Sequence, residues 1–308
     1  MISLQKTLRF ALLGTLIVFA LHAKAEEQED IWLDTMHRSI SESVMDSAKW
    51  FDNFFANEGA EEDQKALGQV RLRLGWEPRS RDLNEFEAKL KVRVKLPHLK
   101  NRVDLILSDD EDIRDDKVRA GRSEQLNRRD EFTIALRYKA KPDSGLSHRI
   151  GFGRRFQYFA KSRYRDSIDL SNSVEMRYDA SIYYYNRDKF GSDFGLALDY
   201  DYSQNTLFRF DNRFYYRDKS EDWLWQHNLQ AFYQLNDSSA LIYGYYLEGL
   251  SKPNYRLDEY LLSIKFRKHT RREWLYYDIE PFILWRRDEN FSASYGVALR
   301  IEGFFGER

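Results

Sequence analysis

The sequence predicts an all-β protein: a transmembrane, antiparallel, up-and-down β-barrel of about fourteen strands, preceded by one amphipathic helix. Three observations predict this fold. Apolar and polar residues alternate with a period of two from residue 68 almost to the C-terminus. The 308 residues include 20 Tyr, 21 Phe and 7 Trp but only 5 Pro. Charged residues make up 32% of the chain, which excludes a bundle of membrane-spanning helices, because such helices need runs of about 20 apolar residues.

The first 25 residues read as a secretory signal peptide. Lys6 and Arg9 precede the apolar stretch 10–21, and Ala23-Lys24-Ala25 supplies the small-x-small pattern of a cleavage site. We therefore expect cleavage after Ala25, with an uncleaved anchor as the alternative. The chain contains no Cys, so the exported protein forms no disulfide and carries no lipid on a cysteine.

An amphipathic helix is predicted next, in a segment comprising residues 26–62. Apolar residues recur there at four-residue spacing among Asp, Glu, Ser and Lys, which is the helical pattern; they are Trp32, Met36, Ile40, Val44 and Ala48. Three placements are open: on a membrane interface, inside the barrel as a plug, or on a periplasmic partner. A charged lumen is a poor host for an apolar stripe, so we expect the helix outside the barrel.

The barrel domain is predicted over residues 63–308. Val70, Leu72 and Leu74 alternate with Arg71 and Arg73, which places one side of the strand in an apolar medium and the other in water. The alternating runs last about 9 to 14 residues, as in strands that cross a bilayer, whereas strands of soluble sandwiches average about 5 or 6. Lipid cannot satisfy an open sheet edge, so the sheet must close.

Fourteen strands are predicted, and an even number returns both ends of the barrel to the periplasmic side. Their ranges are 68–77, 84–96, 102–108, 130–141, 147–154, 158–168, 173–186, 191–203, 206–218, 221–235, 239–250, 255–268, 272–287 and 290–305. Because 148–166 is rich in Arg and Lys and alternates poorly, the fifth and sixth strands are the weakest, and twelve strands remain without them. The turns at 171–173 and 237–239 are expected to be periplasmic, and 109–128 is expected to be one long external loop.

The last strand carries a motif. Residues 294–301 read Ser-Tyr-Gly-Val-Ala-Leu-Arg-Ile, in which Ser294, Gly296, Leu299 and Ile301 occupy a pattern of polar, any, Gly, two of any kind, apolar, any, apolar. This resembles the β-signal of Gram-negative outer-membrane proteins. It departs from the usual final Phe, because Phe305 is followed by three more residues. The resemblance implies an outer-membrane location among lipids and lipopolysaccharide, and recognition by the barrel-assembly machinery. We expect a monomer.

The motifs of common catalytic and metal sites are missing from the sequence, so we expect neither an enzyme nor a cofactor. The chain has no Cys, and no two His residues have metal-ligand spacing. The five His of the mature chain stand outside hydrolase motifs; they are His37, His98, His148, His227 and His269. The acidic run 109–112 lacks the Gly and the terminal Glu of an EF-hand loop. Phosphate-binding Gly-rich loops are also missing, and we expect no nucleic-acid partner.

What remains is the charge on the inner wall. Inward positions on the first two strands are basic, and the acidic inward positions come mostly later. The basic set is Arg71, Arg73, Lys89, Lys91, Arg93 and Lys95, and the acidic set is Glu175, Asp179, Asp199, Asp201, Asp278 and Glu280. Two interpretations are open: a salt-bridged filling of a closed barrel, or a pore whose facing walls carry opposite charge. We expect a narrow channel for passive diffusion of small polar or charged solutes. The alternatives are a structural or assembly barrel acting through its helix and a partner, and, less favoured, a membrane-lipid hydrolase.

The external loop offers a second element of such a pore. Residues 109–116 contain six acids in eight positions. They form either a solvated external loop or a segment folded into the lumen towards the basic wall. The candidate constriction residues are Asp109, Asp110, Asp112 and Asp115.

Overall fold

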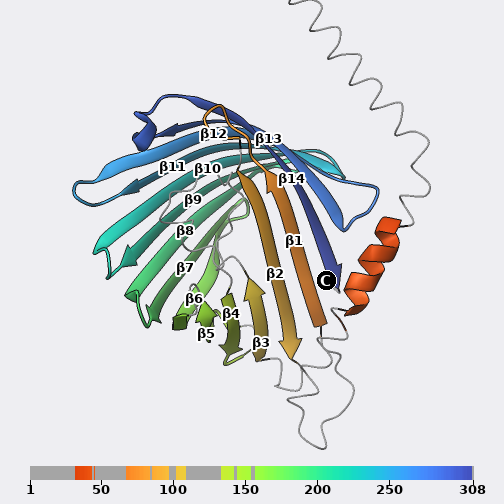
Figure 1. Ribbon diagram of the computed structural model, residues 1–308, viewed down its shortest axis with the longest axis horizontal. Coiled ribbons are helices and arrows are strands. Elements are labelled where there is room, and N and C mark those ends of the chain that lie inside the picture. The colour runs from red at the N-terminus through yellow and green to blue at the C-terminus, as the bar shows by residue number, and fades with distance from the viewer. Residues whose placement is uncertain are drawn as a thin grey trace, which may run out of the picture.

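The fold is a closed barrel of antiparallel strands (Figure 1). The computed structural model describes residues 32–43, 45, 67–83, 85–96, 102–108, 133–141, 144–153 and 157–306. In these residues fourteen strands follow one another around the wall, and the last pairs with the first. The strands are β1 (Leu67–Trp76), β2 (Phe86–Leu96), β3 (Val103–Ser108), β4 (Thr133–Lys139), β5 (Leu146–Gly153), β6 (Gln157–Ser171), β7 (Val174–Tyr185), β8 (Lys189–Ser203), β9 (Thr206–Arg217), β10 (Asp222–Asn236), β11 (Ser239–Leu250), β12 (Arg256–His269), β13 (Leu275–Arg286) and β14 (Ser294–Gly306), with the short 3-10 helix η4 (Arg287–Glu289) before β14.

The two ends of the barrel are distinguished by the chain termini. We call the near end the one at which β1 begins and β14 finishes; the opposite one is the far end. The near end carries the tight turns around residues 172 and 238, which lie together on one side as predicted. The fourteen strands confirm the expected even count.

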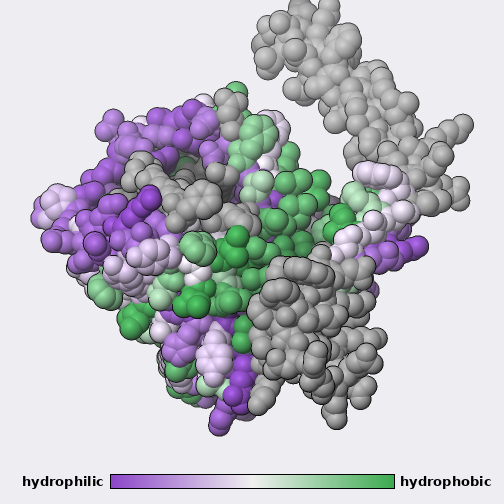
Figure 2. Space-filling view, turned by 60° about the horizontal axis from the view of Figure 1, so that its bottom comes forward, coloured by the Kyte–Doolittle hydropathy of each residue, from purple (hydrophilic) through white to green (hydrophobic). Residues whose placement is uncertain are grey.

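The alternation of the sequence sorts side chains between the two faces of the wall. In the β1–β14 pair, Leu74 lies opposite Ile301, and Arg73 lies opposite Glu302. Leu74 and Ile301 are 52% and 57% exposed on the outside, whereas Arg73 and Glu302 are buried on the inside. Figure 2 shows apolar side chains spread over the outer wall in the middle of the view. This is the reverse of a soluble protein, and it is the arrangement that a bilayer requires.

Aromatic side chains mark both rims of the apolar outer face. At the far end, Trp76 stacks on Phe86 at 6.3 Å between ring centroids, and Tyr260 stacks on Trp285 at 4.7 Å. At the near end the rim is made by tyrosines and phenylalanines, among them Tyr200, Tyr202 and Phe208. Amphipathic rings prefer the interface between hydrocarbon and water, so two such rims indicate the two bilayer surfaces.

The hairpin with the poorest alternation in the sequence is formed. β5 and β6 pair over eight residue positions, with Ile150 opposite Ala160 on the outside and Arg149 opposite Lys161 on the inside. Its alternation is obscured because the polar His148 also faces outward, paired with Ser162. Six strands fall outside the expected length of about 9 to 14 residues: β3, β4 and β5 contain 6, 7 and 8 residues, and β6, β8 and β10 contain 15 each.

Residues 32–43 form the N-terminal helix, which lies against the near end of β14 outside the barrel (Figure 1). The His37 ring stacks on Trp274 at 4.2 Å and on Phe305 at 5.3 Å. His37 Nε2 donates to the Phe304 carbonyl at 3.0 Å, and Ser41 Oγ accepts from the Gly306 amide at 3.2 Å. The helix therefore caps the end of the last strand.

No helix among the described residues is both long and apolar enough to span a membrane. The predicted signal peptide (1–25), the rest of the predicted helical segment and the acidic loop with Asp109, Asp110, Asp112 and Asp115 lie outside the described residues.

Candidate functional site: the charged interior of the barrel

All twelve predicted lumen residues lie on strands at inward positions. The predicted bases occupy β1 and β2, where Arg71 pairs with Lys91 and Arg73 with Lys89. The predicted acids occupy β7, β8 and β13, where Glu175 pairs with Asp199. Burial differs along the wall: Asp179 and Asp278 are buried, whereas Asp201 near the near end is exposed. The role of these residues as the lining of a conducting lumen stays a prediction.

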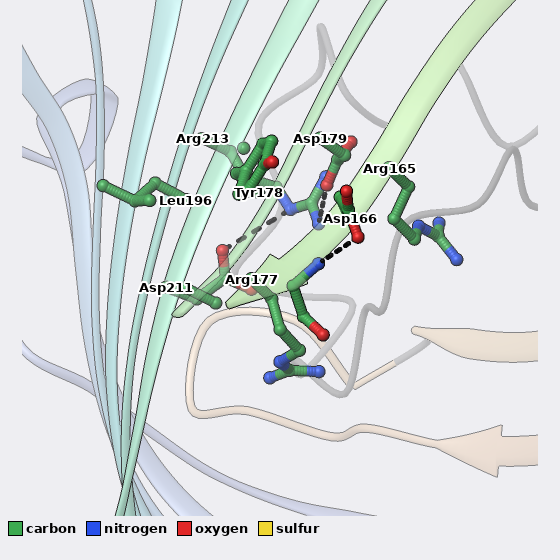
Figure 3. A pocket seen from close by; sticks show the side chains of 11 residues that line it. Arg165, Asp166, Arg177, Tyr178, Asp179, Leu196, Asp211 and Arg213 are labelled. Atoms are coloured by element: carbon green, nitrogen blue, oxygen red, sulfur yellow. Dashed lines mark hydrogen bonds and ion pairs between the residues drawn. The ribbon is translucent and has the colours of Figure 1, made fainter. Parts of the chain in front are cut away.

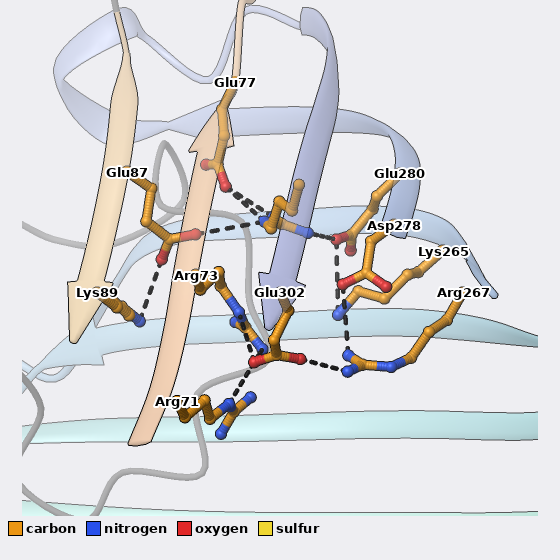
Figure 4. A network of polar contacts seen from close by, with 11 residues as sticks. Arg71, Arg73, Glu77, Glu87, Lys89, Lys265, Arg267, Asp278, Glu280 and Glu302 are labelled. Carbon is orange, nitrogen blue, oxygen red and sulfur yellow. Dashed lines mark hydrogen bonds and ion pairs between the residues drawn. The ribbon is translucent and has the colours of Figure 1, made fainter. Parts of the chain in front are cut away.

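A first network of buried charges joins the two ends of the barrel chain (Figure 4). Its centre is Arg300 on β14, whose side chain is fully buried. Arg300 Nη2 lies 2.7 Å from Glu77 Oε1, Nη1 lies 2.5 Å from Glu280 Oε2, and Nε lies 3.5 Å from Glu87 Oε2. Lys265 lies 3.6 Å from the same Glu280 oxygen. The side chains of this network come from β2, β12, β13 and β14 and from the end of β1, and each of them points inward.

A second cluster lies one inward position closer to the near end, around Glu302 (Figure 4). Its carboxylate forms ion pairs with Arg71, Arg73 and Arg267, and Arg267 also lies 3.4 Å from Asp278. Glu302 is 1% exposed. A carboxylate this deeply buried is tolerated only when it is paired and hydrogen-bonded, and three arginines meet that condition.

A third set of ion pairs runs across β6 to β9. Arg163 lies 2.6 Å from Asp179, and Asp179 also lies 3.4 Å from Arg213. Asp199 accepts two hydrogen bonds from Arg209, at 2.7 and 2.9 Å. Asp179 and Arg213 border a cavity of about 260 Å³ whose lining also includes Arg165, Arg177 and Asp211 (Figure 3). Its walls therefore carry both signs of charge.

These pairs differ from the charge distribution that the sequence suggested. In the structure, the acids of β7 and β8 are bound by arginines of β6, β7 and β9. Glu280 of β13 is bound by Arg300 on the adjacent strand rather than facing the basic residues across the lumen. The residues that the sequence analysis missed are the partners, above all Arg300 and Glu302. Strict alternation places both side chains on the inner face. In the β-signal pattern, however, Arg300 occupies a position at which any residue is allowed, and Glu302 lies beyond the motif.

Part of the interior is apolar. Near the far ends of β11 to β14, inward side chains form a buried cluster of Tyr246, Leu261, Phe282, Leu284 and Ala298. Gly296 belongs to the same wall, and a Cβ atom there would lie 2.3 Å from Phe282 Cζ. The ring of Phe282 therefore lies directly over the glycine.

Two further cavities open near the near end. One, of about 480 Å³, is lined by polar side chains of the β8–β9 and β10–β11 turns, together with Arg267 and His269. The other, of about 630 Å³, is lined by Arg71, Lys91 and Arg93 on one side. Its other walls are the end of β14, Glu273 and Trp274 of the preceding turn, and His37 of the N-terminal helix. The predicted bases of β1 and β2 thus border a space at one mouth of the barrel.

The histidines do not form a catalytic arrangement in the described residues. His148 Nδ1 lies 2.9 Å from Ser162 Oγ on the outer face. However, no hydrogen bond within the described part of the chain orients its Nε2, and a serine nucleophile needs a base that is itself oriented. His227 Nδ1 lies 2.6 Å from Asn212 Oδ1. Among the described residues there is also no group of three or more His, Asp or Glu side chains placed to hold a metal ion.

No protein family and no curated protein matches the sequence. Among solved structures, the outer-membrane channel DcaP of Acinetobacter baumannii is 9% identical with a TM-score of 0.47, covering 82% of this chain and 100% of that one. OmpT, an outer-membrane protein of Vibrio cholerae, is 10% identical with a TM-score of 0.47, covering 81% and 100%. The NanC porin is 11% identical with a TM-score of 0.40, covering 76% and 98%.

Proposed function

We propose that the protein is an outer-membrane channel that lets small polar or charged solutes diffuse passively through a narrow lumen. The observation that carries the proposal is the contrast between the two faces of a closed wall. The outside is apolar, whereas the inside holds ion-paired arginines, lysines and acids around cavities of about 260 to 630 Å³. A barrel of fourteen strands is wider than one of eight, which its own side chains nearly fill.

The apolar outer face also bears on the membrane environment of the barrel. The exposed outer side chains, such as Leu74 and Ile301, would contact outer-membrane lipids and lipopolysaccharide. The motif Ser294, Gly296, Leu299 and Ile301 would be read by the barrel-assembly machinery after export and removal of residues 1–25. The near end would then face the periplasm, and the barrel would act as a monomer.

A conductance recording tests the proposal. Full-length mature protein refolded in detergent is added to a planar lipid bilayer in KCl, with heat-denatured protein as the control. We expect discrete, stable current steps that persist at low voltage. A barrel that inserts, as judged by protease protection and by heat-modifiable migration on SDS gels, but carries no current would contradict the channel.

That negative result would favour the alternative of a structural or assembly barrel. The observation on its side is the N-terminal helix, which the barrel holds at its near end through His37 and Ser41. A partner in the periplasm would meet this helix first. Crosslinking from the exposed face of the helix in whole cells would capture such a partner.

A further inference from the structure

The inward face of β2 to β6 carries far more positive than negative charge. In the described parts of these strands, ten inward side chains are basic and three are acidic, a surplus of seven positive charges. The bases are Lys89, Lys91, Arg93, Lys95, Arg137, Lys139, Arg149, Lys161, Arg163 and Arg165, and the acids are Glu87, Asp104 and Asp169. The predicted basic wall of β1 and β2 therefore continues over three strands that were not part of that prediction.

Several of these bases lie on a single line of paired residues, which we call the basic row. Residues directly opposite each other on successive strands run in the order Lys95, Asp104, Arg137, Arg149, Lys161, Tyr183, Gly191, Arg217. The row begins at Lys95, where β2 reaches the near end of the barrel, and finishes at Arg217, where β9 reaches the far end. Because barrel strands tilt by about 35–45°, a line perpendicular to them climbs the wall as a spiral. The basic row therefore leads from one mouth of the barrel to the other.

The row is costly for folding. Arg137 lies directly opposite Arg149, and Arg149 lies directly opposite Lys161; like charges in such positions destabilise a sheet. The acid within the row, Asp104, serves two bases at once: Arg137 Nε donates to it at 3.0 Å, and Arg93 Nη2 at 3.2 Å. Lys161 is paired with Asp193 of β8 at 3.2 Å. The other bases still outnumber Asp104 along the row, and an anionic solute would offset this excess of positive charge.

We propose that the basic row is a path for anionic solutes, so that the channel prefers small molecules bearing carboxylate or phosphate groups over cations. This inference rests on the proposed channel function. Positive charges along a narrow wall attract anions and repel cations at distances of several ångströms, and they act more strongly there than in bulk water. Arginine also binds carboxylate and phosphate in a bidentate geometry. The cavity beside Arg71, Lys91 and Arg93 places bases at the near mouth.

Ion selectivity in a KCl gradient tests the path without an organic ligand. The variant Lys95→Gln/Arg137→Gln/Arg149→Gln removes three charges of the row. We expect the wild-type channel to be anion-selective and the triple variant to lose about threefold or more of its chloride-to-potassium permeability ratio, with a larger effect at low salt. Asp104→Asn, in the same row, should shift the ratio in the opposite direction.

A charge-neutral control separates the row from charges outside the lumen. Glu221→Gln/Lys252→Gln removes an exposed ion pair of 3.0 Å at the far end of the barrel and leaves the net charge unchanged, so its reversal potential should match that of the wild type. Heat-modifiable migration of each variant on SDS gels shows that it is folded.

A multivalent anion extends the test to a solute. Citrate added to one side should interrupt the chloride current of the wild type, and the triple variant should show few such interruptions; the neutral sugar raffinose should cause none in either. A conducting wild-type channel without anion preference would overturn the inference and leave the channel itself intact. A folded barrel that carries no current would contradict both.

Discussion

Arg300 of the last strand donates from Nε to Glu77 at the end of the first strand, across 2.9 Å, and both side chains are fully buried. The two residues are 223 positions apart in the sequence. The contact forms only when β14 has paired with β1, so it belongs to the closure of the barrel.

Removing the guanidinium group should therefore weaken closure. Arg300→Met leaves Glu77, Glu87 and Glu280 buried around an apolar side chain, and breaking a buried ion pair from one side costs about 3–5 kcal/mol. We expect a clear fall in the temperature at which the folded band on SDS gels converts to the unfolded one. Arg286→Met is the matched control, because Arg286 pairs with the exposed Asp288. Equal melting of both variants would show that the buried cluster does not stabilise closure.

The glycine of the β-signal can be examined as a packing position. Gly296→Asp, or polar substitutions at Leu299 and Ile301 together, should stop insertion and leave periplasmic aggregates or fragments. Leu299 and Ile301 are 40% and 57% exposed on the outer face, so polar side chains there would meet lipid. Quantitative immunoblotting of outer-membrane fractions measures the loss. Normal levels of these variants would show that the motif match is accidental.

A second variant pair separates packing from recognition at the same glycine. A methyl group on Gly296 would collide with Phe282 Cζ, so Gly296→Ala should lower the yield of folded protein. Phe282→Leu removes the colliding ring atoms and should restore the yield in the double variant. If the assembly machinery itself requires glycine, the double variant will refold in detergent but will not accumulate in the membrane.

The N-terminal helix should be separable from the barrel. Deleting residues 28–56 should leave the barrel folded while changing lipid or partner binding, because the contacts of His37 and Ser41 involve only the end of β14 and a neighbouring turn. Far-UV circular dichroism and vesicle flotation measure the two effects. A point variant, His37→Ala, should release the helix to added protease. If the deletion changes nothing but pore conductance, which then rises, the helix is a plug.

The acidic loop makes a prediction about selectivity. Changing Asp109, Asp110, Asp112 and Asp115 to Asn should shift the reversal potential towards anions, more so at low salt, if these acids face the basic wall. The direction follows from removing four negative charges from a lumen. The basic-row variant should shift it the other way, so combining the two changes gives an internal check. An unchanged reversal potential would assign the acids to a solvated external loop.

Much of the wall could be predicted from the sequence. Period-two alternation is local, so each strand reveals its faces without knowledge of its neighbours, and the bounds of β9 and β11 differ from the predicted ones by at most one residue. The hairpin of β5 and β6 was harder to predict, because His148 and Ser162 put polar groups on the outer face.

The partners of the inward charges were decided by the tertiary structure. Alternation along each strand places Arg71, Arg73, Asp278 and Glu280 on the inner face, because a strand turns every second side chain to the same side. Alternation does not reveal that Glu302 binds Arg71 or that Arg300 binds Glu280, because an ion pair depends on which strands adjoin and in what register. Barrel closure brings β14 between β13 and β1, and only that closure joins charges from opposite ends of the chain into one buried network.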